Sequence, residues 1–247
     1  MIRLTPVLCG LAFGALPATA QEHFGYSGAH GPEHWGETCA IGGAQSPVDL
    51  AAAVPGPSLR DMGLQAQWVP VEADVENNGH TIVVNPADPA GAIGYLGTVY
   101  HFRQVHFHHL SEHVVEGQHA DLEAHFVNQS DAGDYLVVGV FLRATGGPSD
   151  FSDFFSRVMG VAPAQAETRA GMPGLMNVGA LLAAGERYYS YEGSLTTPPC
   201  SQNVTWLVQA VPQVMEVPLA AGQRFVELIG QNARPVQPLN GRTVYLH

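Results

Sequence analysis

The 247-residue chain contains no lysine, so its 10 basic side chains are all arginine, and 22 acidic residues outnumber them. The formal net charge is −12. A surface this acidic repels polyanions, which argues against a nucleic-acid-binding function and against docking on anionic membranes. Charged residues make up only 13% of the chain and hydrophobic residues 46%, which is ample material for a large core.

Long hydrophobic runs are also lacking, since no stretch reaches the roughly 18 apolar residues that a membrane-spanning helix needs. The apolar run from Val7 to Leu16 follows Arg3 and precedes the small-residue sequence Ala18-Thr19-Ala20. This pattern is typical of a secretory signal peptide with its cleavage site. We predict a signal peptide over residues 1–20 and one domain over residues 21–247, exported to the periplasm or secreted, without a membrane anchor.

Cysteine is scarce, with three in the whole chain. Cys9 lies in the predicted signal peptide, which leaves Cys39 and Cys200 in the mature protein. An export compartment favours oxidation, so the residues themselves are compatible with one disulfide. Two free thiols are the alternative.

Short apolar segments separated by turn residues predict the fold class. Glycine and proline are abundant, at 28 and 18 residues, and we find no internal repeat or regular strand–helix alternation. We expect a mainly β (α+β) single domain, built on a large, mostly antiparallel twisted sheet with a few peripheral helices. The predicted strands cover 75–85 around a turn, 99–109, 122–128, 135–143, 188–195 and 204–211. The predicted helices cover 149–158, capped by Ser149, 178–184 and 219–230.

Three histidines with alternate spacing stand out against this background. His106 and His108 share one predicted strand, and Glu123 and His125 share another. Residues two apart on a strand point to the same face, so pairing of the two strands would bring three imidazoles together. Three nitrogen ligands with a free fourth position are the arrangement of a catalytic zinc site. A lone histidine on a strand is more often a surface or hydrogen-bonded residue. Whether these histidines form a metal site therefore depends on the other segments of the chain.

Further segments accompany the histidines in a fixed order. They are Gly31-Pro32-Glu33-His34-Trp35, Gln45-Ser46-Pro47-Val48-Asp49, Asn77-Asn78-Gly79-His80, Ser111-Glu112-His113, the stretch from Tyr191 through Gly193-Ser194-Leu195-Thr196-Thr197-Pro198-Pro199-Cys200, Val204-Thr205-Trp206, and Asn232 to Arg242. In this order and spacing they resemble the α-class carbonic anhydrases, from about Phe24 to Arg242. The placement of Cys39 and Cys200 resembles the bacterial exported members, in which these positions form a disulfide.

The resemblance implies a role for each matching position. His106, His108 and His125 resemble the ligands of one Zn²⁺ per chain, and Gln104 and Glu123 resemble the residues that orient His106 and His125. Thr196 resembles the threonine that accepts a hydrogen bond from zinc-bound hydroxide and donates its proton to Glu112. His80 resembles the proton shuttle. The remaining matches are the water-ordering Tyr26, Asn77 and Asn78, and the substrate-binding Val127, Val137, Leu195, Thr197 and Trp206.

Some positions depart from the usual family pattern. His109 stands where many members carry Trp or Thr, Phe24 where Trp is usual, and Ala120 where Tyr is common. His109 follows His108 directly and so points to the opposite face of the strand, which argues against a fourth zinc ligand.

The function implied is reversible hydration of carbon dioxide to bicarbonate and a proton, by attack of zinc-bound hydroxide. Anions and sulfonamides are the inhibitors implied. Bacterial members are often dimers, so a homodimer is an expectation by analogy. Two alternatives stay open: a catalytically silent, carbonic-anhydrase-like binding module, and an exported zinc esterase.

Overall fold

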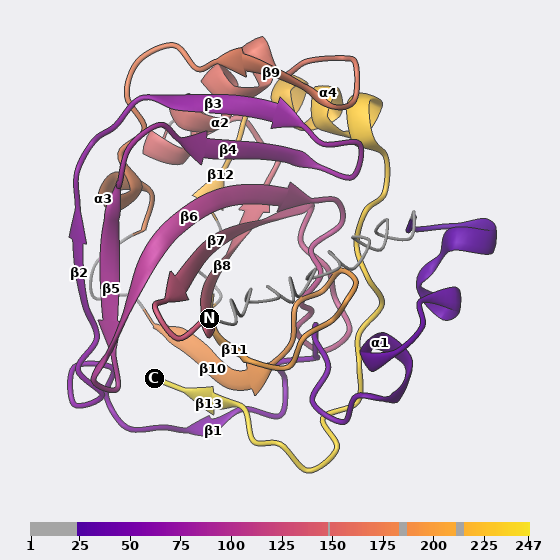
Figure 1. The fold of residues 1–247 in the computed structure, drawn as a ribbon, viewed down its shortest axis with the longest axis vertical. Coiled ribbons are helices and arrows are strands. Elements are labelled where there is room, and N and C mark those ends of the chain that lie inside the picture. The colour runs from indigo at the N-terminus through magenta and orange to yellow at the C-terminus, as the bar shows by residue number, and fades with distance from the viewer. Residues whose placement is uncertain (1–23, 148, 183–186, 211–214) are drawn as a thin grey trace, which may run out of the picture.

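The computed structural model describes residues 24–147, 149–182, 187–210 and 215–247, and the predicted signal peptide lies outside these ranges. One sheet contains all the strands of the described ranges (Figure 1). The strands are β1 (Val54–Pro55), β2 (Gln65–Trp68), β3 (Ala73–Asn77), β4 (Ile82–Pro86), β5 (Gly91–Tyr95), β6 (Thr98–His108), β7 (Leu122–Ser130), β8 (Tyr135–Arg143), β9 (Thr168–Gly171), β10 (Tyr188–Gly193), β11 (Val204–Gln209), β12 (Met215–Glu216) and β13 (Tyr245–Leu246).

The strand order along the main path of the sheet is β1-β13-β10-β11-β8-β7-β6-β4-β3-β9. Most neighbours are antiparallel, and the parallel pairs are β11 with β8, β12 with β8, and β1 with β13. The long central strand β6 sweeps in a strong curve across the molecule (Figure 1). The predicted fold class, a large and mostly antiparallel sheet with few helices, is confirmed.

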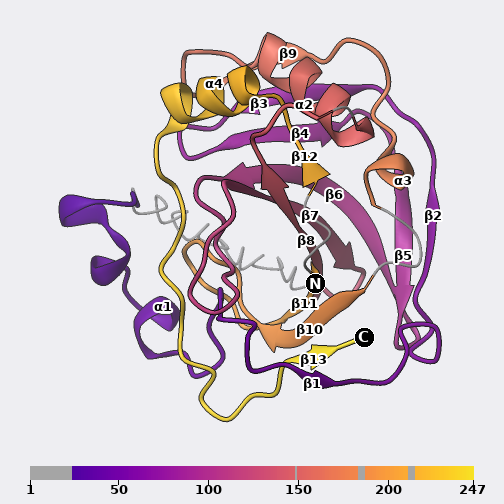
Figure 2. The same cartoon turned by 180° about the vertical axis from the view of Figure 1, so that it is seen from behind.

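The helices of the described ranges are short. They are the 3₁₀ turns η1 (Gly28–His30) and η2 (Pro32–His34), and the α-helices α1 (Thr38–Ile41), α2 (Asp150–Val161), α3 (Val178–Leu181) and α4 (Leu219–Ile229). Seen from behind, α2 and α4 gather near β3, β4 and β9, far from β1 and β13 (Figure 2). None of these helices is long and apolar enough to cross a bilayer.

The predicted start of α2 is confirmed, because the Ser149 hydroxyl accepts a hydrogen bond from the Ser152 amide at 3.0 Å. Asp150 and Asp153 lie in the first turn, where negative charge complements the helix dipole. Phe151, Phe154 and Phe155 then point to one side of the helix, and all three are buried. This apolar stripe fixes α2 on the sheet.

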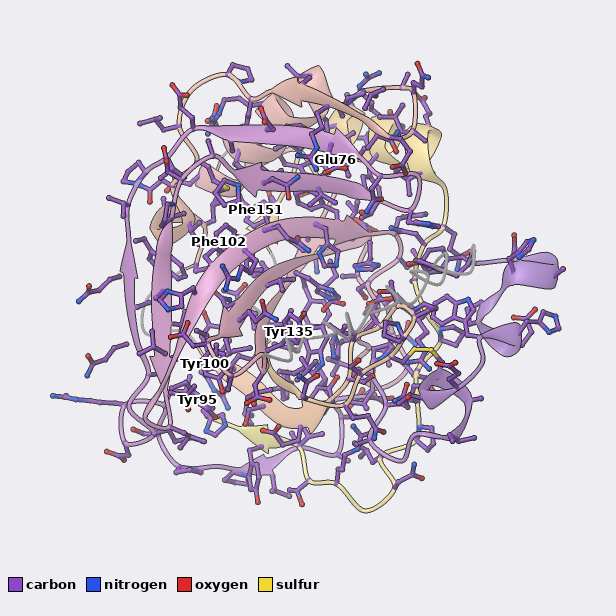
Figure 3. All side chains as sticks on the ribbon, viewed as in Figure 1. Glu76, Tyr95, Tyr100, Phe102, Tyr135 and Phe151 are labelled. Atoms are coloured by element: carbon purple, nitrogen blue, oxygen red, sulfur yellow. A yellow bond between two sulfur atoms is a disulfide. The ribbon has the colours of Figure 1, made fainter. Side chains whose placement is uncertain are left out.

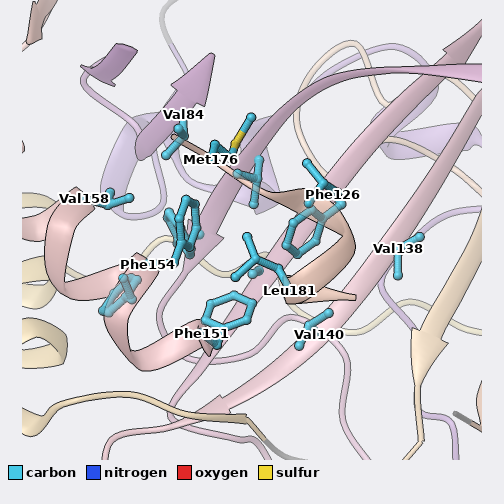
Figure 4. Packing of buried hydrophobic residues seen from close by; sticks show 14 of the residues in the cluster. Val84, Phe126, Val138, Val140, Phe151, Phe154, Val158, Met176 and Leu181 are labelled. Carbon is cyan, nitrogen blue, oxygen red and sulfur yellow. The ribbon is translucent and has the colours of Figure 1, made fainter. Parts of the chain in front are cut away.

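Alternate residues of the central strands divide the core into two clusters. Phe126 of β7 and Val138 of β8 pack with Phe151 and Phe154 of α2 (Figure 4). Their immediate neighbours Val127 and Val137 belong to a second cluster, which also contains Tyr191 and Trp206. Since successive side chains point to opposite faces of a strand, the helices cover one face and leave the other free for a site. Strand β8 is buried from Leu136 to Leu142, so both of its faces are covered.

Cys39 and Cys200 are joined in a disulfide between α1 and the loop that follows β10 (Figure 3). The two cysteines are 161 residues apart in the sequence. Chain-entropy arguments give about 5 kcal/mol of stabilisation for closing a loop of this length, as an upper value. The bond therefore ties the irregular N-terminal segment to the loop that carries Thr196 and Thr197.

Candidate active site

Three imidazoles converge on the face of the sheet opposite the helices. His106 and His108 lie on β6, and His125 on β7 is the register partner of His106. The ring centroids are 5.0 Å apart for His106 and His108, 5.2 Å for His106 and His125, and 4.6 Å for His108 and His125. One nitrogen from each ring lies within 4.8 Å of the other two. The alternate spacing in the sequence thus becomes a cluster of three nitrogen donors.

Each ring has an acceptor on its outer nitrogen. His106 Nδ1 lies 2.9 Å from Gln104 Oε1, and His108 Nδ1 lies 2.9 Å from the carbonyl oxygen of Asn232. His125 Nε2 lies 2.9 Å from Glu123 Oε1. A neutral imidazole that donates from one nitrogen presents a lone pair on the other. The inward-facing lone pairs are then those of His106 Nε2, His108 Nε2 and His125 Nδ1.

Burial keeps these rings in the form that can bind a metal. It lowers the pKa of His106 well below its ordinary value, and the neighbouring His108 and His125 lower it further. Burial also lowers the pKa of His108, against the opposing effect of Glu112. A cationic imidazolium has no free lone pair, so a depressed pKa favours the ligand form at neutral pH.

The donor set fits a divalent metal ion of the zinc type. His108 Nε2 is buried and has no hydrogen-bond partner among the described residues, which is costly unless something else occupies it. Three imidazole nitrogens with an acceptor behind each are the usual surroundings of a catalytic zinc ion. The structure therefore offers a preformed site for such an ion.

A second group of possible donors, His113, Glu123 and His125, serves a different purpose. Glu123 Oε1 lies 2.7 Å from His113 Nδ1, and Glu123 Oε2 accepts from the His113 amide at 2.9 Å. His113 Nε2 lies 2.7 Å from the Tyr191 hydroxyl, which contacts the Ser46 hydroxyl at 2.9 Å. These hydrogen bonds give the polar atoms of His113 and Glu123 partners within the protein. It forms a buried support that holds Glu123 behind His125.

Glu112 is fully buried beside the three histidines, with Oε1 3.5 Å from His108 Nδ1 and Oε2 3.9 Å from His125 Nδ1. Oε1 accepts a hydrogen bond from the Arg234 amide at 2.9 Å. Oε2 has no partner among the residues that the structure describes, so no hydrogen bond joins it to the Thr196 hydroxyl. Thr196 is also buried, at 5% exposure.

The Arg234 side chain fixes the segment behind Glu112. Its guanidinium donates to Gln45 Oε1 at 2.9 Å, to the Ser46 carbonyl at 2.8 Å and to the Cys39 carbonyl at 3.0 Å. It also lies 5.6 Å from the centre of the Trp35 ring. One buried arginine thus connects Glu112, the disulfide and the N-terminal segment.

A cavity of about 600 Å³ opens over this cluster. Its lining residues are Phe24, Tyr26, Asn78, His80, Thr81, Val83, Gln104, His106, His108, Glu167 and Thr197. The predicted water-ordering Tyr26 and Asn78, the predicted shuttle His80 and the predicted substrate-binding Thr197 therefore share one space with two of the histidines. The His80 ring is stacked on Phe24, with centroids 4.0 Å apart and planes 11° apart.

Asn77 does not line this cavity. Its side chain accepts a hydrogen bond from the Gly79 amide at 2.9 Å and donates to the Pro163 carbonyl at 3.0 Å. Asn78 Oδ1 accepts from the amides of His80 and Thr81 at 2.9 and 2.8 Å. The contacts of Asn77 therefore shape the turn that carries His80.

The residues expected to form the apolar wall share one core cluster, of which Trp206 packs against a histidine. Val127, Val137 and Trp206 belong to the second core cluster, and Leu195 packs against it. The Trp206 ring centroid is 4.8 Å from that of His125. His109 is separate, as expected: its Nδ1 lies 3.0 Å from the Asp121 carbonyl, and it lines a different cavity with Asp121 and Glu227.

Asn232, Arg234 and His113 support the site although the sequence analysis assigned them no role. Each lies in a segment that matched the family pattern, which was the available signal. Asn232 and Arg234 contact residues 124 and 122 positions earlier, His108 and Glu112. Spacing within one strand cannot reveal contacts of such separation.

Comparison with known proteins agrees with this geometry. A family model described as "Eukaryotic-type carbonic anhydrase" matches residues 30–247. The chain belongs to this family. A carbonic anhydrase of Nostoc sp. is 38% identical, over 92% of this chain and 88% of that protein. One from Neisseria gonorrhoeae is 35% identical, over 98% and 96% of the two chains.

The fold comparison gives the same family. The α-carbonic anhydrase of Thermovibrio ammonificans, solved with the inhibitor sulfanilamide, superposes with a TM-score of 0.83 at 36% identity, covering 92% of this chain and all of that one. The chain is therefore an enzyme of the carbonic anhydrase class. Carbon dioxide hydration is the reaction that this family catalyses.

Proposed function

We propose that the chain catalyses the zinc-dependent, reversible hydration of carbon dioxide to bicarbonate and a proton, with one Zn²⁺ held by His106, His108 and His125. The observation that carries this proposal is the convergence of three imidazoles, two buried and one half-buried, each with its outer nitrogen on an acceptor, at a cavity of about 600 Å³. Three neutral nitrogens leave room for a water molecule and a substrate.

When bound, zinc supplies Lewis acidity that lowers the pKa of a water molecule from its value in bulk water to about 7, as is known for carbonic anhydrase itself. The protein's own part is to keep three lone pairs aimed inward. Gln104, Glu123 and the Asn232 carbonyl do this by holding the outer nitrogens. Mutation of such supporting residues commonly lowers metal affinity or activity by about 10–100-fold.

Thr196 and Glu112 would orient the reacting oxygen. Glu112 Oε2, which has no hydrogen-bond partner among the described residues, would accept the Thr196 hydroxyl proton after a small movement of either side chain. Once the hydroxyl proton is committed to Glu112, Thr196 Oγ1 can only accept a hydrogen bond from the reacting oxygen. A lone pair of that oxygen is then free to face carbon dioxide. Arg234, through its amide on Oε1, would keep the Glu112 carboxylate in place for this task.

Carbon dioxide is small and apolar, so it suits a wall without charges. Val127, Val137, Leu195 and Trp206 form such a wall beside His125, and Thr197 lines the cavity. The wall would hold the substrate without competing for the proton-transfer groups.

His80 would carry the released proton to solvent. His80 is half-buried and lines the cavity. Tyr26 and Asn78 are half-buried and line the same cavity, where they would order the water between the reacting oxygen and His80. Imidazole side chains generally titrate near neutral pH, which suits a relay. Burial and the charge of Glu112 raise the pKa of Tyr26, so its hydroxyl keeps its proton and serves as a hydrogen-bonding group.

We also propose that residues 1–20 are removed on export and that residues 21–247 act in the periplasm or outside the cell. The Cys39–Cys200 disulfide supports an oxidising compartment. The intact mass of protein purified from the periplasm should correspond to a chain that begins at Gln21. A mature form that still carries residues 1–20 would contradict this.

The test of the main proposal combines zinc content with carbon dioxide hydration, measured with and without a sulfonamide. One zinc per chain and sulfonamide-sensitive hydration are expected, since a relative of this fold was solved with sulfanilamide. Anions should inhibit as well. Zinc binding without hydration would indicate a silent binding module, and ester hydrolysis without hydration an esterase. Sedimentation of the same sample would show whether the chain forms a homodimer.

A further inference from the structure

Glu167 places a carboxylate in the cavity of the candidate active site. Among the described residues that line this cavity, it alone is acidic. Glu167 directly precedes β9, and its amide donates to the Asn77 carbonyl at 2.7 Å. Thr168 is the register partner of Asn77. The backbone therefore fixes Glu167 against the turn that carries His80.

The Glu167 side chain faces this same turn. A Cβ placed on Gly79, the residue before His80, would lie 3.7 Å from Glu167 Oε1. Since Glu167 and His80 both line the cavity, a molecule that reaches His80 from solvent passes close to this carboxylate.

The charge of Glu167 is not neutralised by the described part of the protein. No ion pair or side-chain hydrogen bond links it to another described residue. Arg169, the nearest basic residue in the sequence, lies 2.8 Å from Glu76 on the neighbouring β3. Glu167 therefore places a carboxylate without a described counter-charge in the cavity, within a chain whose net charge is already −12.

This charge acts on the last step of the proposed reaction. The N–H bond of the His80 imidazolium breaks, and the proton forms a new bond to a dissolved base, with no change in oxidation state. A dianionic base such as hydrogen phosphate is repelled as it approaches a carboxylate. An uncharged base such as imidazole is not repelled, and its cationic product is attracted.

We propose that Glu167 selects the proton acceptor of the enzyme, favouring uncharged nitrogen bases over polyanionic ones. The inference rests on the proposed function and on His80 as the shuttle. Glu167 is a specificity-determining residue for the second substrate, the base, and takes no part in the attack on carbon dioxide.

The test compares two buffers as proton acceptors for the zinc-loaded, full-length mature protein. Under buffer-limited conditions at low ionic strength, kcat for hydration is measured against the concentration of phosphate and of imidazole. For a dianion that passes about 8–12 Å from the charge, Coulomb's law in water predicts that Glu167→Gln raises the phosphate slope about three- to sixfold. The imidazole slope should stay unchanged. Glu167→Lys should raise the phosphate slope further, and salt near 0.5 M should abolish both effects.

A matched control is Glu227→Gln, which removes an equal charge from the exposed surface of α4 at a different cavity. It should leave both slopes unchanged. Equal phosphate-to-imidazole ratios in the wild type and Glu167→Gln would overturn the inference, as would an equal response of the control, which would indicate a whole-molecule charge effect. Absence of hydration in the wild type would overturn the proposed function and the inference with it. Retained hydration with an unchanged ratio overturns the inference alone.

Discussion

The three-histidine cluster and the mouth of its cavity are built in different ways. Around the cluster, each outer nitrogen has a named acceptor, and Glu123 is itself held by His113. At the cavity opening, His80 is half-buried on a turn, and its ring is stacked on that of Phe24. The contrast teaches that the buried hydrogen bonds of this site orient the three converging imidazoles, whereas the proposed proton shuttle lies on a turn that is partly exposed.

The largest expected effect comes from removing one of the three converging imidazoles. His108→Ala should abolish hydration and most bound zinc, because two nitrogens remain and the buried Asn232 carbonyl loses its donor. Metal analysis after dialysis, together with hydration assays, checks this. His109→Ala is the matched control, since His109 faces a separate cavity. Full zinc occupancy and normal activity in His108→Ala would refute the assignment.

The second-largest effect is expected on kcat when His80 is replaced. His80→Ala should lower kcat in weak buffer by about 10²-fold at most and leave kcat/KM for hydration nearly unchanged, because the shuttle acts after carbon dioxide has reacted. Added imidazole should restore kcat. His101→Ala, an exposed histidine 3.6 Å from Asp131, is the control. A fall in kcat/KM without rescue by imidazole would mean that His80 only supports its turn.

A smaller effect is expected when the hydrogen-bond acceptor behind one histidine is removed. Gln104→Ala removes the acceptor 2.9 Å from His106 Nδ1 and should weaken zinc affinity about 10–100-fold. Competition with a chelator measures this affinity independently of activity. Gln67→Ala, on the exposed strand β2, should have no effect. An unchanged zinc affinity in Gln104→Ala would show that packing alone orients His106.

The smallest effect is the pH dependence of stability in the metal-free protein. Burial depresses the pKa of His106 and His108 in the folded state, so below about pH 6.5 the unfolded chain binds more protons. The free energy of unfolding should therefore be fully retained above about pH 6.5 and fall as the pH drops below it, by at most about 1.4 kcal/mol per pH unit for each histidine. Urea titrations of the metal-free protein should show a shallower slope for His106→Asn. An unchanged slope would contradict this cause.

Local pattern predicted the parts of the fold and site that depend on local geometry. Period-two spacing predicted that His106 and His108 share a face, and the register of β6 with β7 brings His125 to them. The helix predicted over 219–230 is α4, Leu219–Ile229. The helix predicted over 178–184 corresponds to α3, Val178–Leu181, and part of the predicted range lies outside the described residues.

Features set by distant parts of the chain were not predicted. Strand β9 contains Thr168 and Arg169, half-buried and exposed residues with no apolar alternation, and it forms by pairing with β3. The contacts of the Asn77 side chain with Gly79 and Pro163 were not predicted, because the identity of a turn residue does not say which way its amide points. Glu167 was overlooked for a similar reason: an exposed acid beside a turn becomes notable only when the fold places a cavity next to it.

The contacts of Asn232 and Arg234 have a consequence for biogenesis. Both residues lie near the end of the chain, yet they hold His108 and Glu112, and Arg234 also reaches Cys39, 195 positions earlier. Contacts between residues so far apart in the sequence form slowly, and only after the intervening chain has been synthesised. A growing polypeptide that has released β6 and β7 already carries all three histidines but lacks the carbonyl that orients His108. The oriented set of three nitrogen donors is therefore complete only after the C-terminal segment has been synthesised and has folded against β6.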